Sequence, residues 1–237
     1  MLSKVCDFAS LAGDADRWLG KVITQYLSDK LQNYIRSSRS PLKGMIALFC
    51  GPTFEIEESR KDLETLMTRL KLTFILGFSA NFVNPPMVAD ALGTFCISLY
   101  CKGMSLEEAI IEVFGGKREF LTKYPVVLMR RDSTTELISS QMMAYGALSH
   151  NPWGVPKPEC PTCKTNVNVQ AKIRKKGEKV SWRCGCGMVS EECSEMPSCV
   201  RKVAANWLND FYWVDYPLPE SPYRVTWRKK GLCERGN

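Results

Sequence analysis

Four cysteines in the second half of the chain have the spacing of a metal site. Cys160 and Cys163 form a Cys-Pro-Thr-Cys pair, and Cys184 and Cys186 form a second pair with only Gly185 between them. Two thiolates held by a tight turn can bind one side of a tetrahedral ion, and a second pair can complete the coordination. A site closed by four thiolates has no open position for a substrate. The pattern therefore predicts a structural Zn²⁺ site.

The second pair departs from the two-residue spacer that is usual in zinc sites. Either Cys193 or Cys199 could therefore replace one of its members as a ligand. Disulfides and free thiols are the alternatives to metal. The chain has 11 cysteines and no secretory pattern at its N-terminus, which favours reduced thiols and an intracellular location, in the cytoplasm or nucleus.

The residues between the two pairs have the alternation of a β-hairpin. Apolar residues alternate with polar ones before and after a turn that we predict at residues 176–178. The alternating residues are Val167, Val169, Ala171, Ile173, Val180 and Trp182. Each end of such a hairpin would carry one cysteine pair, and residues 160–187 resemble a zinc ribbon.

The same hairpin is rich in cations, which suggests nucleic-acid binding as an alternative function. Lysine and arginine can contact phosphates, and an adjacent tryptophan can stack on a base. A solvated turn whose lysines discourage edge-to-edge pairing explains the same composition. The residues concerned are Lys172, Arg174, Lys175, Lys176, Lys179 and Trp182.

Cys50 is the candidate nucleophile of the first half of the chain. It ends an apolar run, residues 42–50, that we expect to form a buried strand. A cysteine nucleophile needs a base, which is normally an imidazole. The only histidine is His150, and none precedes Cys50. We therefore expect Cys50 to pack as a small apolar side chain, and we predict no catalytic residue.

The elements that position these residues follow from apolar periodicity. In the first part we expect helices over about 15–36, 57–71, 85–100, 105–114 and 136–148, and strands over 42–50, 72–80 and 124–129. Strands separated by helices imply a small, mainly parallel sheet with flanking helices. After the hairpin we expect a helix over 197–211 and an edge strand over 225–228. The fold class is thus α/β, with a C-terminal zinc-ribbon-like module that contains a helix.

Charge and tryptophan content divide the chain near residue 150. Residues 1–150 carry 17 Lys and Arg against 16 Asp and Glu, whereas residues 151–237 carry 15 against 9 and five of the 6 tryptophans. A Pro/Gly segment at 150–156 is typical of a linker. We therefore predict an α/β domain over 1–150 and a cysteine-rich domain over 151–237. The apolar runs are too short to span a membrane, and we predict no membrane association.

Residues 45–129 resemble the CHAT branch of the caspase-like peptidases. The resemblance rests on a strand ending in Cys-Gly, the strand and turn FILGFSANF, the helical segment MVADALGTFCISLY, and the short helix MSLEEAIIEVF. It implies a caspase-like segment with Cys50 at the position of the nucleophile. The histidine that precedes the cysteine in that family has no counterpart, so we expect a degenerate member. Together with the cysteine-rich C-terminal part, this segment also resembles divergent proteins of basidiomycete fungi, and the resemblance implies that lineage for the chain.

These observations favour a non-catalytic intracellular zinc-binding protein that acts as a binding or regulatory module for a protein partner. Two alternatives stay open. One is a cysteine peptidase that uses Cys50 with a base supplied by a partner. The other is a nucleic-acid-binding zinc-ribbon protein that uses the basic hairpin, residues 172–183.

Overall fold

The computed structural model describes residues 29–37, 42–48, 53–80, 83–146, 151–174, 179–205, 210–219 and 222–230. The chain separates into two compact units, Met1–Met142 and Met143–Asn237. The division falls inside strand β4 (Ile138–Tyr145), whereas the predicted linker lies further along the chain. None of the helices in the described ranges is long and apolar enough to cross a membrane.

The sheet of the first unit has the strand order β1-β2-β3-β4. Strand β1 (Gly44–Ile46) pairs in parallel with β2 (Phe74–Phe78), but β3 (Val126–Arg131) pairs antiparallel with β2. The predicted mainly parallel sheet is therefore wrong, because the sheet is mixed. The reason lies in the connection from β2 to β3. The Ser79 N–H donates to the Pro125 carbonyl at 2.9 Å. The helical segment between the two strands therefore returns the chain to the end of β2, and β3 runs back alongside it in the opposite direction.

Strand β4 replaces the helix that we predicted over residues 136–148. A tight turn joins β3 directly to β4: the Asp132 N–H donates to the Leu137 carbonyl, and Asp132 Oδ1 accepts from the N–H groups of Thr134 and Thr135 at 2.8 and 2.7 Å. These two hydrogen bonds lower the pKa of the Asp132 carboxyl. Pairing with β3 thus overrides the helical propensity of the Glu, Gln, Met and Ala residues that follow the turn.

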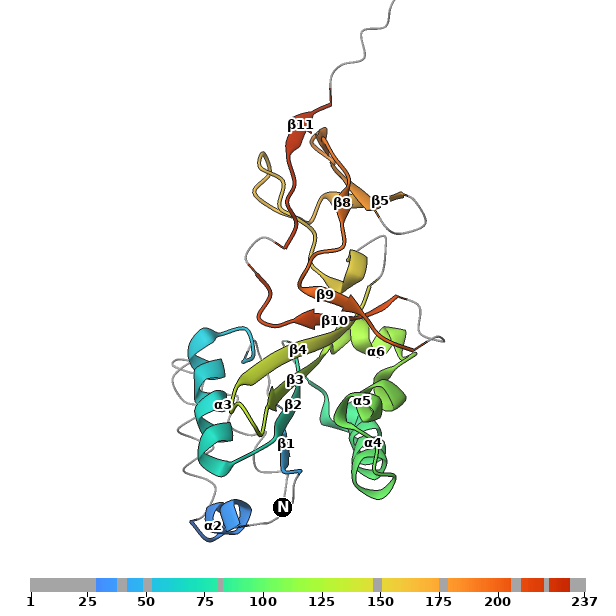
Figure 1. Ribbon diagram of the computed structural model, residues 1–237. Helices are drawn as coiled ribbons and strands as arrows, with labels where there is room; N and C mark the ends of the chain where they lie inside the picture. The colour runs from blue at the N-terminus through green and yellow to red at the C-terminus, as the bar shows by residue number, and fades with distance from the viewer. Residues whose placement is uncertain are drawn as a thin grey trace, which may run out of the picture. The chain divides into compact units, whose positions relative to one another are not determined.

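Helices cover both faces of this sheet (Figure 1). Helix α3 (Glu57–Leu70) lies on one face, whereas α4 (Pro85–Cys96), its π-helical extension η3 (Ile97–Cys101), α5 (Leu106–Phe114) and α6 (Arg118–Lys123) lie on the other. The predicted helices at 57–71, 85–100 and 105–114 are confirmed. Ser105 begins α5 with a capping box completed by Glu108. Helix α2 (Asp29–Ser37) is the described part of the helix predicted over 15–36.

Strand β2 is buried throughout and forms the centre of the core. Phe74 packs edge-on against Phe95 of α4, and Phe78 packs in the same way against Phe114 of α5, each at 6.1 Å between ring centroids. Gly77 leaves room for the ring of Phe54. The predicted strands at 72–80 and 124–129 are confirmed. Strand β1 is shorter than the predicted 42–50, and Cys50 lies outside the described residues.

The second unit contains a sheet with the strand order β11-β7-β6-β5, and β8 also pairs with β6. Its strands are β5 (Val169–Arg174), β6 (Lys179–Cys184), β7 (Met188–Ser190), β8 (Ser194–Glu195) and β11 (Trp227–Lys229). Strands β5 and β6 pair antiparallel, which confirms the predicted hairpin, and β11 confirms the predicted edge strand. The short 3₁₀ helix η4 (Pro152–Gly154) contributes the buried side chain of Trp153 to this unit.

A strand lies inside the region where we predicted a helix over residues 197–211, and a second strand begins at the last residue of that region. Strand β9 (Val200–Lys202) pairs antiparallel with β10 (Phe211–Asp215), and the prediction is wrong for the described residues. Four of the five β10 side chains are buried. The apolar residues Phe211, Trp213 and Val214 have high strand propensity, and burial on both faces of a strand explains their continuous run better than one helical stripe does.

Candidate metal centre

The first cysteine pair, Cys160 and Cys163, lies in a tight loop before β5. The Cys160 N–H donates to the Thr165 carbonyl at 3.0 Å, and the Lys164 N–H donates to the Cys160 carbonyl at 2.8 Å. Lys164 has a φ of 53°, in the left-handed region, which turns the chain sharply after Cys163. The loop therefore directs two thiols to one side.

The second cysteine pair, Cys184 and Cys186, follows from the end of β6. Cys184 is the last residue of that strand and pairs with Val169 of β5. Beyond it, the Gly185 N–H donates to the Asn168 carbonyl at 3.1 Å, and the Gly187 N–H donates to the Cys184 carbonyl at 3.0 Å. The hairpin register thus places this turn beside the loop that carries the first pair.

The four sulfur atoms form one cluster. All lie within 4.8 Å of one another, with Cys160 Sγ 3.5 Å from Cys186 Sγ and Cys163 Sγ 3.7 Å from Cys184 Sγ. A tetrahedral ion with Zn–S bonds of about 2.3 Å would separate its sulfur ligands by about 3.8 Å. A disulfide needs about 2.05 Å. The cluster consequently has the dimensions of a four-thiolate metal site, and its cysteines are free thiols.

Protons are distributed unevenly over the cluster. Burial raises the pKa of the Cys160 thiol, but hydrogen bonds from the backbone N–H groups of Cys163 and Thr162, and then from the second cysteine pair, lower it to about 7. Hydrogen bonds to the second cysteine pair, followed by burial, raise the pKa of Cys163 to about 12. The Cys160 thiolate therefore depends on protons held by neighbouring thiols. A divalent cation is the partner that lets all four sulfurs ionise together.

The cluster is the quartet predicted from spacing, and neither alternative ligand belongs to it. Cys193 is exposed and Cys199 is half-buried, and among the described residues the group that could hold a metal ion includes neither of them. Cys50 and His150 lie outside the described residues, so the prediction that Cys50 lacks a base stays a prediction.

The basic hairpin does not offer the aromatic platform that the nucleic-acid-binding alternative requires. Trp182 is 1% exposed, and its indole N–H donates to Ser194 Oγ at 2.9 Å. The proposed stacking role of Trp182 is therefore wrong, because the residue is part of the core. Lys172 is exposed, and Lys179 forms an ion pair with Glu195 at 2.7 Å. Lys175, Lys176 and the side chain of Arg174 lie outside the described residues.

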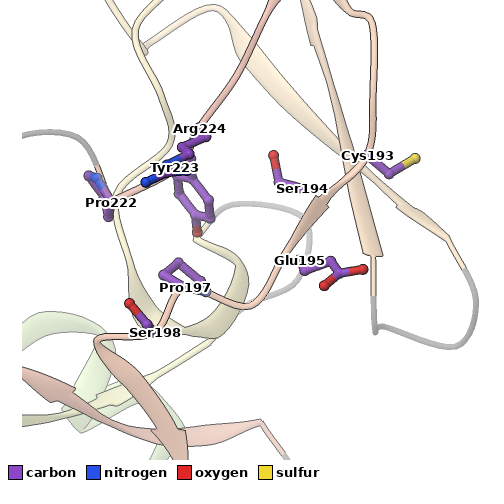
Figure 2. Close-up of a pocket in the computed structure, with 8 residues that line it drawn as sticks. All are labelled: Cys193, Ser194, Glu195, Pro197, Ser198, Pro222, Tyr223 and Arg224. Carbon is purple, nitrogen blue, oxygen red and sulfur yellow. The ribbon is translucent and has the colours of Figure 1, made fainter.

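A pocket of about 300 Å³ lies between β8 and the segment that precedes β11 (Figure 2). Its buried polar groups are used inside the protein: Ser194 accepts from Trp182, and the Tyr223 hydroxyl donates to the Pro152 carbonyl at 2.9 Å. In Figure 2 the Cys193 thiol points away from the pocket. The pocket thus presents no converging set of reactive groups.

Comparison with models of known families, with curated proteins and with solved structures finds no match to this chain. The four-cysteine cluster, which could hold a metal ion, is therefore the feature from which a function can be argued.

Proposed function

We propose that the two cysteine pairs bind one Zn²⁺ ion and that the chain is a non-catalytic zinc-binding protein that acts as a binding or regulatory module. The observation that carries this proposal is the cluster of four sulfurs within 4.8 Å of one another. Tetrahedral four-sulfur sites hold zinc or iron–sulfur groups. The sulfur spacing of 3.5 and 3.7 Å across the two pairs fits a single ion.

A structural role for the ion follows from the ligand set. Four protein ligands fill a tetrahedral zinc and leave no position for water or substrate. The ligands also join two segments of the chain: the loop before β5 and the turn after β6. Because a small sheet buries little apolar surface, metal binding would supply part of its folding free energy. The module would then act through its surface, on a protein partner, rather than through the ion.

The metal content of the purified full chain tests this proposal. We expect about one zinc per chain by elemental analysis. Cys163→Ser and Cys186→Ser should each lose most of it, because three thiolates and a hydroxyl bind zinc weakly at neutral pH. Cys193→Ser is the matched control, since this exposed cysteine lies outside the cluster, and it should keep the wild-type content.

Two results would contradict the proposal. One is equal zinc content in the wild type and both cluster variants. The other is iron with visible absorption in place of zinc, which would assign the cluster to an iron–sulfur group. In the expected case, cobalt substitution should give the spectrum of a tetrahedral sulfur site that Cys163→Ser alters and Cys193→Ser does not.

A further inference from the structure

The sheet of the second unit has two faces of different chemistry. Arg183 of β6 pairs with Gln170 of β5 and with Val189 of β7, and Val189 pairs with Arg228 of β11. Directly paired residues project from the same face of a sheet. These four residues therefore form one row across four strands, with two arginines in it.

Residues two positions along each strand extend this row on the same face. Lys172 follows Gln170 on β5. Lys230 follows Arg228, and its N–H donates to the Gly187 carbonyl at 2.9 Å, which continues the pairing. The basic face is defined by four exposed side chains, Lys172, Arg183, Arg228 and Lys230. Lys179 lies on the same side but pairs with Glu195.

The opposite face of the same strands is apolar. Its paired residues Val169 and Cys184, together with Val180 and Trp182, are at most 1% exposed. The basic side chains consequently have no role in the core. In the described part of the chain, none of the four basic-face residues forms an ion pair. Two described carboxylates lie on this face: Glu191, which is exposed and two residues beyond Val189, and Glu195, which pairs with Lys179.

The spacing of the cations suits the backbone of a duplex. Neighbouring strands lie about 4.8 Å apart, so Arg183 and Arg228, two strands apart, start about 10 Å from each other. Arg228 and Lys230 start about 7 Å apart along their strand. These separations lie between the groove widths of about 6 and 12 Å that separate the two phosphate backbones of a double helix.

We propose that the basic face binds the phosphate backbone of a double-stranded nucleic acid without reading its sequence. Single strands are usually held by stacking on exposed aromatic rings. Among the described residues the basic face has none, because Trp182 and Trp227 belong to the opposite face of the sheet. This inference goes beyond the proposed function, since it depends on the sheet and not on the identity of the metal.

Binding of the metal-loaded full chain to a fluorescent duplex of mixed sequence tests the proposal by anisotropy. Four phosphate contacts give a slope of about −3.6 in log affinity against log salt. Affinity should then fall about 100-fold between about 50 and 200 mM salt. A second duplex of unrelated sequence should bind equally, and a single strand of the same length should bind more weakly.

Neighbouring residues of β11 provide the matched control. Arg228→Gln should weaken binding and reduce the salt slope by about 1, whereas Lys229→Gln should leave both unchanged. The two variants have the same net charge, but their side chains project from opposite faces. Arg183→Gln/Arg228→Gln should reduce the slope by about 2.

The proposal is overturned if the duplex does not bind at low salt, or if Arg228→Gln and Lys229→Gln weaken binding equally. It is also overturned if phosphatidylserine vesicles bind more tightly than the duplex, which would assign the face to a membrane surface. Zinc content is measured in the same samples. A loss of binding with normal zinc therefore concerns the basic face alone, whereas a failure of the metal proposal leaves the comparison of Arg228 with Lys229 intact.

Discussion

Tyr223 shows how a single side chain holds the interior of the second unit together. Its ring contacts Trp182 and Trp153, at 4.9 and 6.1 Å between centroids, and its hydroxyl donates to the Pro152 carbonyl. Because that hydrogen bond is buried, the carbonyl has no water to replace a lost donor.

Tyr223→Phe should therefore lower the free energy of unfolding by about 1–3 kcal/mol. Urea unfolding followed by tryptophan fluorescence measures this loss. Tyr34→Phe is the control, because the Tyr34 side chain is 72% exposed. A loss in Tyr223→Phe no larger than that in Tyr34→Phe would show that the buried bond contributes nothing.

The same residue predicts a dependence on alkaline pH. Burial, with a smaller contribution from the charge of Cys199, raises the pKa of Tyr223 above its ordinary value. The stability that Tyr223 contributes is then fully present below about pH 10, the pKa of an unfolded tyrosine, and is lost as the pH rises above it. Wild-type stability should fall more steeply between about pH 10 and 12 than that of Tyr223→Phe, as measured by urea unfolding at each pH. Parallel curves would contradict this expectation.

At the scale of elements, alanine substitutions at two glycines should change the stability of the protein in opposite directions. A Cβ at position 77 would overlap the Phe54 ring and lie 3.2 Å from the Ala47 carbonyl, whereas a Cβ at position 93 would meet nothing within 4 Å. Gly77→Ala should destabilise the protein by about 1–3 kcal/mol. Gly93→Ala in α4 should stabilise it by about 1 kcal/mol, because alanine has the higher helix propensity. Thermal unfolding of both variants compares them, and a change of the same sign would contradict the packing described for β2.

The elements that were predicted correctly are those whose signals are local. Helix α5 follows from Ser105 and Glu108 at its start and from apolar residues at helical spacing, and the hairpin follows from alternation. The segment that contains β4 has no such local signal, because its apolar residues fit a helix almost as well as a strand. Its conformation depends on pairing with β3, which is set by the Asp132 turn. The apolar residues before β10 also have helical spacing, but β9 and β10 pair as strands instead.

The candidate functional residues also differ in whether their signals in the sequence are local. The cysteine quartet could be predicted from spacing because each pair lies within one turn, and the hairpin between them fixes their approach. The basic face could not, because Arg228 reaches the row of Arg183 only through β7, far from β11 in the chain. The alternation of Val225, Trp227 and Lys229 with Arg228 and Lys230 was the available signal. The nucleic-acid-binding alternative considered only residues of the hairpin and therefore included Trp182. The pairing of β5 with β6 places that side chain on the buried face of the sheet.

At the scale of the whole molecule, the two units should respond differently to loss of metal. Chelation at neutral pH should remove hydrogen-exchange protection from β5, β6 and β7, because the ligands close the ends of this hairpin. Strands β2 and β3 of the first unit should keep their protection, since their core is built from Phe74, Phe78 and their helical neighbours. Equal loss in both units would show that the ion stabilises the entire chain, and no loss in either would show that it stabilises neither.

The alternation along β11 also determines which insertions and deletions the C-terminal region can tolerate. Removing one residue between Tyr223 and Trp227 would shift the strand by one position against β7 and invert its two sides. The indole of Trp227 would then project from the basic face, and the guanidinium of Arg228 would project from the apolar face. Length changes in this short stretch should therefore be far more damaging than most point substitutions within it.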